Sequence, residues 1–223
     1  GDQHGNLVWV STRDCSAQRR HQKLIEEAPA HDLAAGIEDE MGAAAIKAAK
    51  AVGYYNAGTV EFIYQDGEFF FLEMNTRLQV EHPVTELVTG LDLVTWQIRI
   101  ARGERLTIDP EQALTPRGHA IECRVYAEDP DQKFMPTPGK ITRWRPPLGP
   151  GVRDDSGAAS GFEVPIYYDS MISKLVVWGA DRVEAMARMR RAVREYDIQG
   201  VTTTLGFFRW LLDQAAFVSA NFD

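Results

Sequence analysis

The sequence predicts an α+β fold in which antiparallel strands are flanked by helices. β-rich runs on either side of short turn motifs predict strands, and runs with apolar residues three and four positions apart predict helices. Near residue 104 a Pro-containing connector separates a helix-rich part from a part with many short strands and turns. A length of 223 residues fits one large domain or two small ones equally well. The change near residue 104 leads us to expect one domain over 1–106 and a second over 107–223.

The composition is that of an ordinary globular protein and excludes several classes. It is 44% hydrophobic and 25% charged, with no low-complexity tract. No apolar run approaches the roughly 18 residues of a membrane helix, and the first residues carry no signal pattern, so a cytoplasmic protein without a membrane partner is expected. The formal net charge of −8 argues against a nucleic-acid partner. Cys15 and Cys123 fit neither a metal nor a disulfide spacing and are expected to be free, buried thiols.

The first 25 residues predict a β-hairpin that carries a cationic segment. Residues 8–12 alternate apolar and polar, residues 14–16 have turn chemistry, and residues 18–25 would run back as the second strand. Since little sequence precedes the first strand, we expect the chain to be a piece of a longer polypeptide. Candidates for phosphate or bicarbonate binding in this segment are Gln18, His21 and Lys23. A solvated basic strand is an equally good interpretation.

The run 37–53 predicts the first helix, which Gly53 would cap. Its apolar face is formed by Ile37, Met41, Ala44, Ala45, Ala48 and Val52.

Residues 59–75 predict a second hairpin, whose loop length decides which side chains share a face. The β-rich runs 59–64 and 68–75 flank the turn motif at 65–67. A two-residue loop would mix charge into both faces. A three-residue loop gathers Val60, Phe62, Tyr64, Phe70, Leu72 and Met74 on one face and Glu61, Glu73 and Asn75 on the other. We prefer the three-residue loop because it buries a clean apolar face.

Polar residues continue at every second position after this hairpin. They are Glu73, Asn75, Arg77, Gln79 and Glu81, which an extended chain would align over about 26 Å. Glutamates and an amide offer the oxygen ligands that Mg²⁺ requires, and arginine suits an oxyanion such as bicarbonate. A nearby carboxylate is able to remove the bicarbonate proton. A solvated strand face and a salt-bridge ladder remain as alternatives.

The remaining elements are predicted to be scaffold. Pro83 suits the first turn of a helix, and a second helix covers 93–101. Strands are predicted over 117–125, 140–144 and 174–178, a basic helix over 182–196 and a last helix over about 203–215. The inward face of the basic helix would be Val183, Met186, Met189, Ala192 and Val193.

Five segments carry a family resemblance. They are RDCSAQRRHQK at 13–23, EMNTRLQVEHPVTE at 73–86, RGHAIECR at 117–124, PTPGKI at 136–141 and YYDSMI at 167–172. Together they resemble biotin carboxylase, the ATP-grasp enzyme of acetyl- or propionyl-CoA carboxylase type that uses ATP and bicarbonate to carboxylate biotin. The resemblance covers nearly the whole chain. It implies the carboxyl-terminal part of the ATP-grasp fold, followed by the biotin carboxylase C-terminal subdomain.

The resemblance also implies a role for each candidate residue. Glu61, Glu73 and Asn75 would hold the Mg²⁺ or Mn²⁺ of bound ATP, and Gln18 and His21 would lie along the nucleotide. Lys23, Arg77, Gln79 and the backbone of Val80 would hold bicarbonate. Glu81 would act as general base, and Arg124 would stabilise the enolate of biotin.

The resemblance further implies partners and limits. Biotin would arrive on a separate carboxyl carrier domain, a carboxyltransferase subunit or domain would use the product, and the full enzyme would be a homodimer. Because the family's amino-terminal domain and Gly-rich lid have no counterpart here, we expect the chain alone to be inactive. One rival is another ATP-grasp ligase such as carbamoyl-phosphate synthetase, which would not explain the segments around 117–124 and 136–141. A second rival is a non-catalytic assembly domain.

Overall fold

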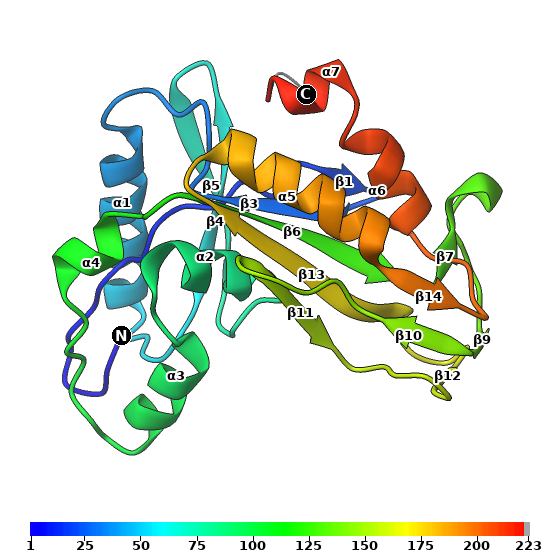
Figure 1. Cartoon of the computed structure of the whole chain (residues 1–223). Helices are drawn as coiled ribbons and strands as arrows, with labels where there is room; N and C mark the ends of the chain where they lie inside the picture. Colours follow the sequence, from blue (N-terminus) through cyan, green and yellow to red (C-terminus); the bar gives the residue numbers. More distant parts are fainter. Residues whose placement is uncertain (221–223) are drawn as a thin grey trace. The chain divides into compact units, whose positions relative to one another are not determined.

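Figure 1 shows the protein as a computed structural model, which describes residues 1–220. The chain divides into two compact units. The first unit consists of Gly1–Arg13 and Ala28–Arg117, and the second consists of Asp14–Glu27 and the chain from Gly118 onward. Helices and antiparallel strands occur in both units, which confirms the predicted α+β class. None of the described helices has the length and apolar character needed to cross a bilayer.

The first unit begins its helical part with α1 (Ile37–Ala51), as predicted. The chain leaves this helix through Gly53, whose φ of 61° is the left-handed conformation that glycine adopts readily. Trp9 packs against α1 at Gly42, where a Cβ would overlap the indole ring. The predicted apolar face is wrong at Val52, which is exposed because the buried contact runs along the side of the helix that contains Gly42.

The other elements of the first unit are β4 (Thr59–Gln65), β5 (Glu68–Asn75), α2 (His82–Thr89), α3 (Leu93–Ala101) and α4 (Pro110–Leu114). Pro83 lies in the first turn of α2, where its missing N–H is not needed for a helical hydrogen bond. Asp92 caps α3 by accepting a hydrogen bond from the Thr95 N–H. The two predicted helices are confirmed, whereas α4 forms within the connector and was not predicted.

The second unit contains a four-stranded sheet in the order β11-β13-β6-β3, formed by Val152–Ser156, Met171–Gly179, His119–Tyr126 and Ile25–Ala28. Short antiparallel pairs join β1 (Gln18–Arg19) to β2 (Gln22–Lys23), β7 (Glu128–Asp129) to β8 (Met135–Pro136), β9 (Gly139–Lys140) to β12 (Glu163–Val164) and β10 (Arg143–Arg145) to β14 (Asp197–Gln199). A 3₁₀ turn covers Pro130–Gln132, and the helices are α5 (Arg182–Glu195), α6 (Leu205–Leu211) and α7 (Ala215–Val218). The predicted strands over 117–125 and 174–178 are confirmed, whereas the run 140–144 divides between β9 and β10.

The main core of the second unit lies between one face of this sheet and the helices α5 and α6 (Figure 1). Cys123 on β6 and Leu175 on β13 are fully buried there, as is Met189 on α5. The predicted inward face of α5 is wrong at Val183, which is 80% exposed, because the buried stripe begins two residues later at Ala185. Burial of apolar area has no preferred direction, so it does not by itself fix how two strands pair. The register is instead fixed by the alternation that turns the apolar side chains of each strand toward the helices.

The two cysteines form no disulfide, as predicted. Cys15 is only half-buried, whereas Cys123 is fully buried. Burial, followed by the carboxylates of Glu26, Glu122 and Glu27, raises the pKa of the Cys123 thiol. A thiol that stays protonated is a poor nucleophile, so Cys123 behaves as a small apolar core residue.

The predicted amino-terminal hairpin is wrong, because the hairpin in this part of the chain has other strands and another turn. Residues 8–12 lie in no strand, and the hairpin arms instead join at the bridge between Asp14 and Glu27. The turn is formed by Arg20 and His21, with φ of 49° and 65°. A two-residue turn of this kind needs positive φ at both positions, which Asn-Gly normally signals, and this sequence lacks that signal.

The predicted last helix, over about 203–215, is divided in two. α6 ends at Leu211, and Gln214 adopts an extended conformation before α7 begins. An extended residue interrupts the ladder of helical hydrogen bonds, so the apolar pattern continues across two helices instead of one.

Candidate active site

The β4–β5 hairpin determines which acidic side chains meet. Gln65 pairs with Glu68, so the loop consists of Asp66 and Gly67 with φ of 53° and 83°. The predicted three-residue loop is therefore wrong. The register shifts between Glu61 and Phe62, where the ladder skips one residue of β5 and forms a β-bulge.

The bulge has the same effect on the acidic residues as the predicted odd loop. Phe62 pairs with Phe71, whereas its neighbour Glu61 pairs with Glu73. Residues that pair directly point to the same side of the strands, so Glu61 and Glu73 share one face. Asn75 pairs with Thr59 and lies on that face as well.

The apolar face of the hairpin differs from the prediction in two positions. Phe62 contacts Phe69 and Phe71 edge to face, with ring centroids 5.3 and 6.4 Å apart. Phe70 and Leu72 were predicted for this face, but Phe70 pairs with Ile63 and Leu72 is the residue that the ladder skips, and both are exposed like Phe71. The two-residue loop moves the odd-numbered aromatic residues of β5 onto the Phe62 side, which explains the exchange.

The two glutamates are joined by one amide. The Asn75 amide nitrogen donates to Glu61 Oε1 at 3.2 Å and to Glu73 Oε1 at 2.8 Å. Carboxylates directly opposite each other destabilise a strand pair unless something positive lies between them. Two carboxylates and an amide oxygen are the donor set that a hard divalent cation accepts alongside waters and phosphates, so these residues fit Mg²⁺ or Mn²⁺. Among residues 1–220, no group of three or more His, Cys, Asp and Glu side chains could hold a metal ion, so the proposed ligand set includes the amide of Asn75.

Behind this pair lies a support that was not predicted. The Gln79 amide nitrogen donates to Glu61 Oε1 at 2.7 Å, and its oxygen accepts from Arg13 Nη2 at 2.7 Å. Arg13 also donates to Thr59 Oγ1 and Thr85 Oγ1. Gln79 is buried, so this chain of hydrogen bonds fixes the orientation of Glu61. The sequence placed Arg13 only in a basic segment, and no local spacing links it to a residue 66 positions away.

The chain beyond Asn75 does not continue as the predicted extended row. β5 ends at Asn75, Arg77 is exposed, and Glu81 is only 2% exposed just before α2. Arg77 stays close to the acidic set because its Nη2 lies 3.4 Å from the Asn75 Oδ1. Val80 is half-buried in the turn that precedes α2. The five polar side chains therefore do not form one even line.

In the second unit, three predicted residues lie on the β1–β2 hairpin. Gln18 pairs with Lys23 across the two strands, so these side chains share a face. His21 lies in the exposed turn. The Gln18 amide donates to the Cys15 carbonyl at 2.8 Å, while Lys23 is half-buried.

The fourth predicted residue of the second unit, Arg124, lies in the middle of β6. Its Nε and Nη2 lie 2.6 and 2.5 Å from Glu26 Oε1. Glu26 is fully buried and Arg124 is 9% exposed, so the contact is a buried ion pair. The sequence did not single out Glu26 as a site residue.

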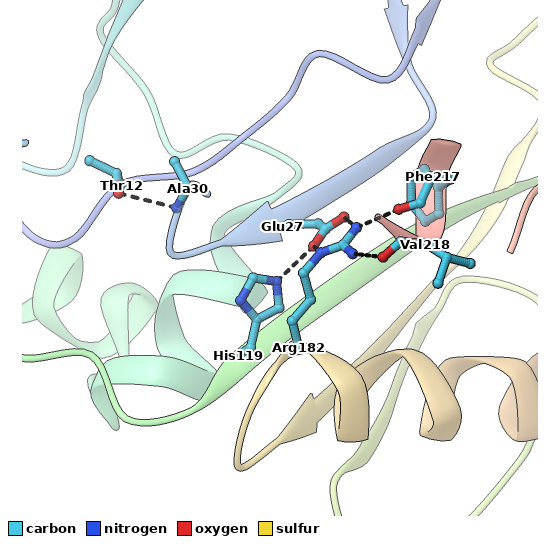
Figure 2. Close-up of polar contacts among 7 residues, drawn as sticks. All are labelled: Thr12, Glu27, Ala30, His119, Arg182, Phe217 and Val218. Carbon is cyan, nitrogen blue, oxygen red and sulfur yellow. Dashed lines mark hydrogen bonds and ion pairs between the residues drawn. The ribbon is translucent and has the colours of Figure 1, made fainter. Parts of the chain in front are cut away.

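The residue after Glu26 makes a second buried cluster, shown in Figure 2. Glu27 accepts from His119 Nε2 at 2.7 Å and from Arg182 Nε and Nη2 at 2.7 and 2.8 Å. Arg182 also donates to the carbonyls of Phe217 and Val218, which ties α7 to this group. Burial by itself would raise the pKa of Glu27, but the hydrogen bonds and charges of His119 and Arg182 lower it to about 2. In the first unit, the same view includes Thr12 Oγ1, which accepts from the Ala30 N–H at 3.2 Å.

The predicted residues therefore divide between the units. The structure brings Glu61, Glu73, Asn75 and Gln79 into one hydrogen-bonded group in the first unit. It places Gln18 beside Lys23, and separately pairs Arg124 with Glu26, in the second unit.

Two family models match the chain, one in each part. The ATP binding domain of the carbamoyl-phosphate synthase L chain matches residues 1–109, and the biotin carboxylase C-terminal domain matches residues 122–223.

Relatives and solved structures agree with these matches. The chain is 56% identical over 216 residues to a pyruvate carboxylase subunit of Methanothermobacter thermautotrophicus, covering 97% of this chain and 44% of that protein. It is 53% identical over 221 residues to the biotin carboxylase of Nostoc sp., covering 99% and 49%. The biotin carboxylase domain dimer of Hydrogenobacter thermophilus 2-oxoglutarate carboxylase, solved with MgADP, ADP and bicarbonate, is similar with a TM-score of 0.96 at 47% identity, covering 100% of this chain and 49% of that chain. The chain spans about half the length of the curated relatives it matches.

Proposed function

Because the chain belongs to the biotin carboxylase family, we propose that the whole protein containing it is an ATP-dependent ligase that carboxylates biotin with bicarbonate. The observation that best supports this proposal is the direct opposition of Glu61 and Glu73 with Asn75 between them. The alternative of a carbamoyl-phosphate synthetase is less well supported, because the match at 122–223 is to the biotin carboxylase C-terminal domain.

Glu61, Glu73 and Asn75 are proposed to hold Mg²⁺ or Mn²⁺. Such an ion, when bound with ATP, neutralises charge on the phosphates and favours attack on the γ-phosphate. Arg13 and Gln79 contribute by holding Glu61 in place, so that the carboxylate need not reorient when nucleotide binds.

Bicarbonate and nucleotide are proposed to bind the remaining polar candidates. Arg77, Gln79 and the backbone of Val80 would bind bicarbonate, and so would Lys23. An amide nitrogen carries two hydrogens, so the bond from Gln79 to Glu61 uses only one of them. Gln18 and His21 would lie along the nucleotide.

The proposed chemistry requires one base and one anion-stabilising cation. Glu81 would remove the proton of bicarbonate, whose oxygen then attacks the γ-phosphorus and displaces ADP to give carboxyphosphate. Carboxyphosphate would break down to CO₂ and phosphate, the phosphate would accept the N1 proton of the substrate biotin, and N1 would attack CO₂ to give carboxybiotin. Arg124 would place its guanidinium against the ureido oxygen as that proton leaves.

Further parts of the proposal concern organisation. A biotin carboxyl carrier domain and a carboxyltransferase would be partners, the whole enzyme would be a homodimer, and its compartment would be the cytoplasm. We also propose a domain boundary near residue 107, which limited proteolysis would reveal as a preferred cleavage between residues 104 and 118.

Biotin-dependent ATP hydrolysis tests the function. The whole protein is expected to hydrolyse ATP faster when free biotin is added with bicarbonate and Mg²⁺, and to form carboxybiotin in equal amount. The 223-residue chain by itself is expected to show no such activity, because the two-sided nucleotide site of the family would be incomplete. Ammonia-dependent carbamoyl phosphate formation in place of carboxybiotin would support the carbamoyl-phosphate synthetase alternative and contradict the proposal.

A further inference from the structure

Two adjacent glutamates on β3 each bind an arginine on a different element. Glu26 binds Arg124 of β6, and Glu27 binds Arg182 of α5 together with His119. Successive side chains of a strand point to opposite faces of its sheet, so the two carboxylates work on opposite sides of β3. All of these residues lie within the second unit, which is one compact body.

Arg124 is tied by its side chain to β3 and by its backbone to Leu24, the residue before that strand. Nε and Nη2 converge on a single oxygen, Glu26 Oε1, and the Arg124 N–H donates to the Leu24 carbonyl at 3.0 Å. A guanidinium fixed by two nitrogens cannot rotate about its last bonds without losing both contacts. The position of the Arg124 charge is therefore set by β3.

Orientation accounts for this contact better than charge does. A carboxylate beside Arg124 weakens the attraction of the guanidinium for any other anion, so Glu26 does not strengthen the field of Arg124. What Glu26 supplies is the carboxylate partner that a largely buried cation needs, beside the hydrogen bond between the Arg124 side chain and Tyr126. Lys174 pairs with Arg124 across β13 and β6, but its Nζ lies 3.5 Å from Asp155 Oδ2, so this second cation has a carboxylate of its own.

The cluster around Glu27 fixes β3 from the other face. Its carboxylate uses both oxygens, one for His119 and both for the fork of Arg182. Arg182 in turn is held by two carbonyls of α7 and lies 5.5 Å from the Phe217 ring centroid. Because Glu27 is anchored in this way, the backbone of its neighbour Glu26 has little freedom to follow a moving guanidinium.

We propose that Glu26 is a positioning residue for the biotin step, which aims Arg124 at the ureido oxygen of biotin and does not itself touch substrate. The inference rests on the proposed function, since it assumes that Arg124 faces biotin. The same inference gives Glu27, one residue away, a role in stabilising the fold only.

The test compares two activities of the whole protein. Bicarbonate-dependent ATP hydrolysis is measured without biotin and then with free biotin over a range of concentrations, for the wild type, Glu26→Ala, Glu26→Gln and the matched control Glu27→Gln. For Glu26→Ala, kcat/KM for biotin is expected to fall about 100-fold beyond any loss of the biotin-independent rate, since displacing a catalytic group by about 1 Å costs on this order. Glu26→Gln keeps an acceptor oxygen and should recover part of that loss. Glu27→Gln should lower both rates by the same factor.

A double-mutant cycle separates positioning from general destabilisation. In an Arg124→Ala background, Glu26→Gln is expected to leave the remaining biotin dependence unchanged, because there is no guanidinium left to aim, and to raise the melting temperature by removing a buried carboxylate that has lost its arginine. The proposal would be overturned if Glu26→Gln lowered the biotin dependence by the same factor in that background as in the wild type. It would also be overturned if Glu26→Ala lowered the biotin-dependent and the biotin-independent rates equally. A wild-type protein without biotin-dependent turnover would instead overturn the proposed function.

Discussion

The two glutamate pairs of this chain use the same side chain for opposite purposes. Glu61 and Glu73 face each other across β4 and β5 and share one amide. Glu26 and Glu27 sit side by side on β3, and each binds an arginine. Opposed carboxylates lower the stability of a hairpin, whereas matched buried charges hold elements together. The first arrangement is therefore expected where a cation must bind, and the second where the fold must not move.

The largest expected effect comes from removing the opposed charges. Replacing both Glu61→Gln and Glu73→Gln is expected to lower biotin-dependent ATP hydrolysis by the whole protein by about 100- to 1,000-fold, because both proposed metal ligands lose their charge. The melting temperature of the 223-residue chain should stay the same or rise, since the repulsion across the hairpin disappears. Glu68→Gln, on the same strand but opposite Gln65, is the control and should leave both quantities unchanged. Full activity of the double variant would show that these glutamates hold no metal.

The opposite result is expected for the matched pair in the second unit. Glu27→Ala is expected to lower the free energy of unfolding by about 3–5 kcal/mol, because Arg182 and His119 lose their shared partner in a buried place. Urea denaturation of the 223-residue chain measures this change. Glu195→Gln, which removes an exposed pair with Arg191, should cost less than about 0.5 kcal/mol. A Glu27→Ala cost as small as this control would mean that the cluster does not stabilise the fold.

The pH dependence of stability provides a sharper test of the same cluster. The pKa of Glu27 is lowered from 4.5 to about 2 in the folded chain, so its contribution is fully present above pH 4.5 and is lost as the pH falls toward 2. Between pH 7 and pH 3 the wild type should lose roughly 2 kcal/mol more of its unfolding free energy than Glu27→Gln does. Denaturation curves of both proteins at the two pH values give this difference. Equal losses in the two proteins would assign acid sensitivity to other carboxylates.

The comparison also shows what the sequence was able to predict. Helix α3 was predicted with its correct bounds, and the structure shows that Asp92 caps its start and that Gly103 follows its end. The common face of Glu61 and Glu73 was also correct, although the reason given was wrong. A bulge has no signature in the residues around Leu72, so alternation alone favoured the odd loop.

Local sequence patterns could not predict the contacts between distant parts of the chain. The bonds from Arg13 to Gln79 and from Arg124 to Glu26 join residues 66 and 98 positions apart. Two successive glutamates predict a polar, exposed stretch, and no neighbouring residue in the sequence indicates that both are buried. The family resemblance supplied Arg124, but only the fold shows which residue holds it.

The smallest expected effect concerns the turn that sets the register of the opposed pair. Gly67 has a φ of 83° with open space around its Cα, so Gly67→Ala is expected to cost about 1–2 kcal/mol through backbone strain alone. Gly206 in α6 also has open space but an ordinary φ, so Gly206→Ala should instead stabilise by a few tenths up to about 1 kcal/mol. Thermal denaturation of the two variants should therefore shift in opposite directions from the wild type. If both rise together, Asp66 and Gly67 do not form the tight turn, and the pairing of Glu61 with Glu73 must be set elsewhere in the hairpin.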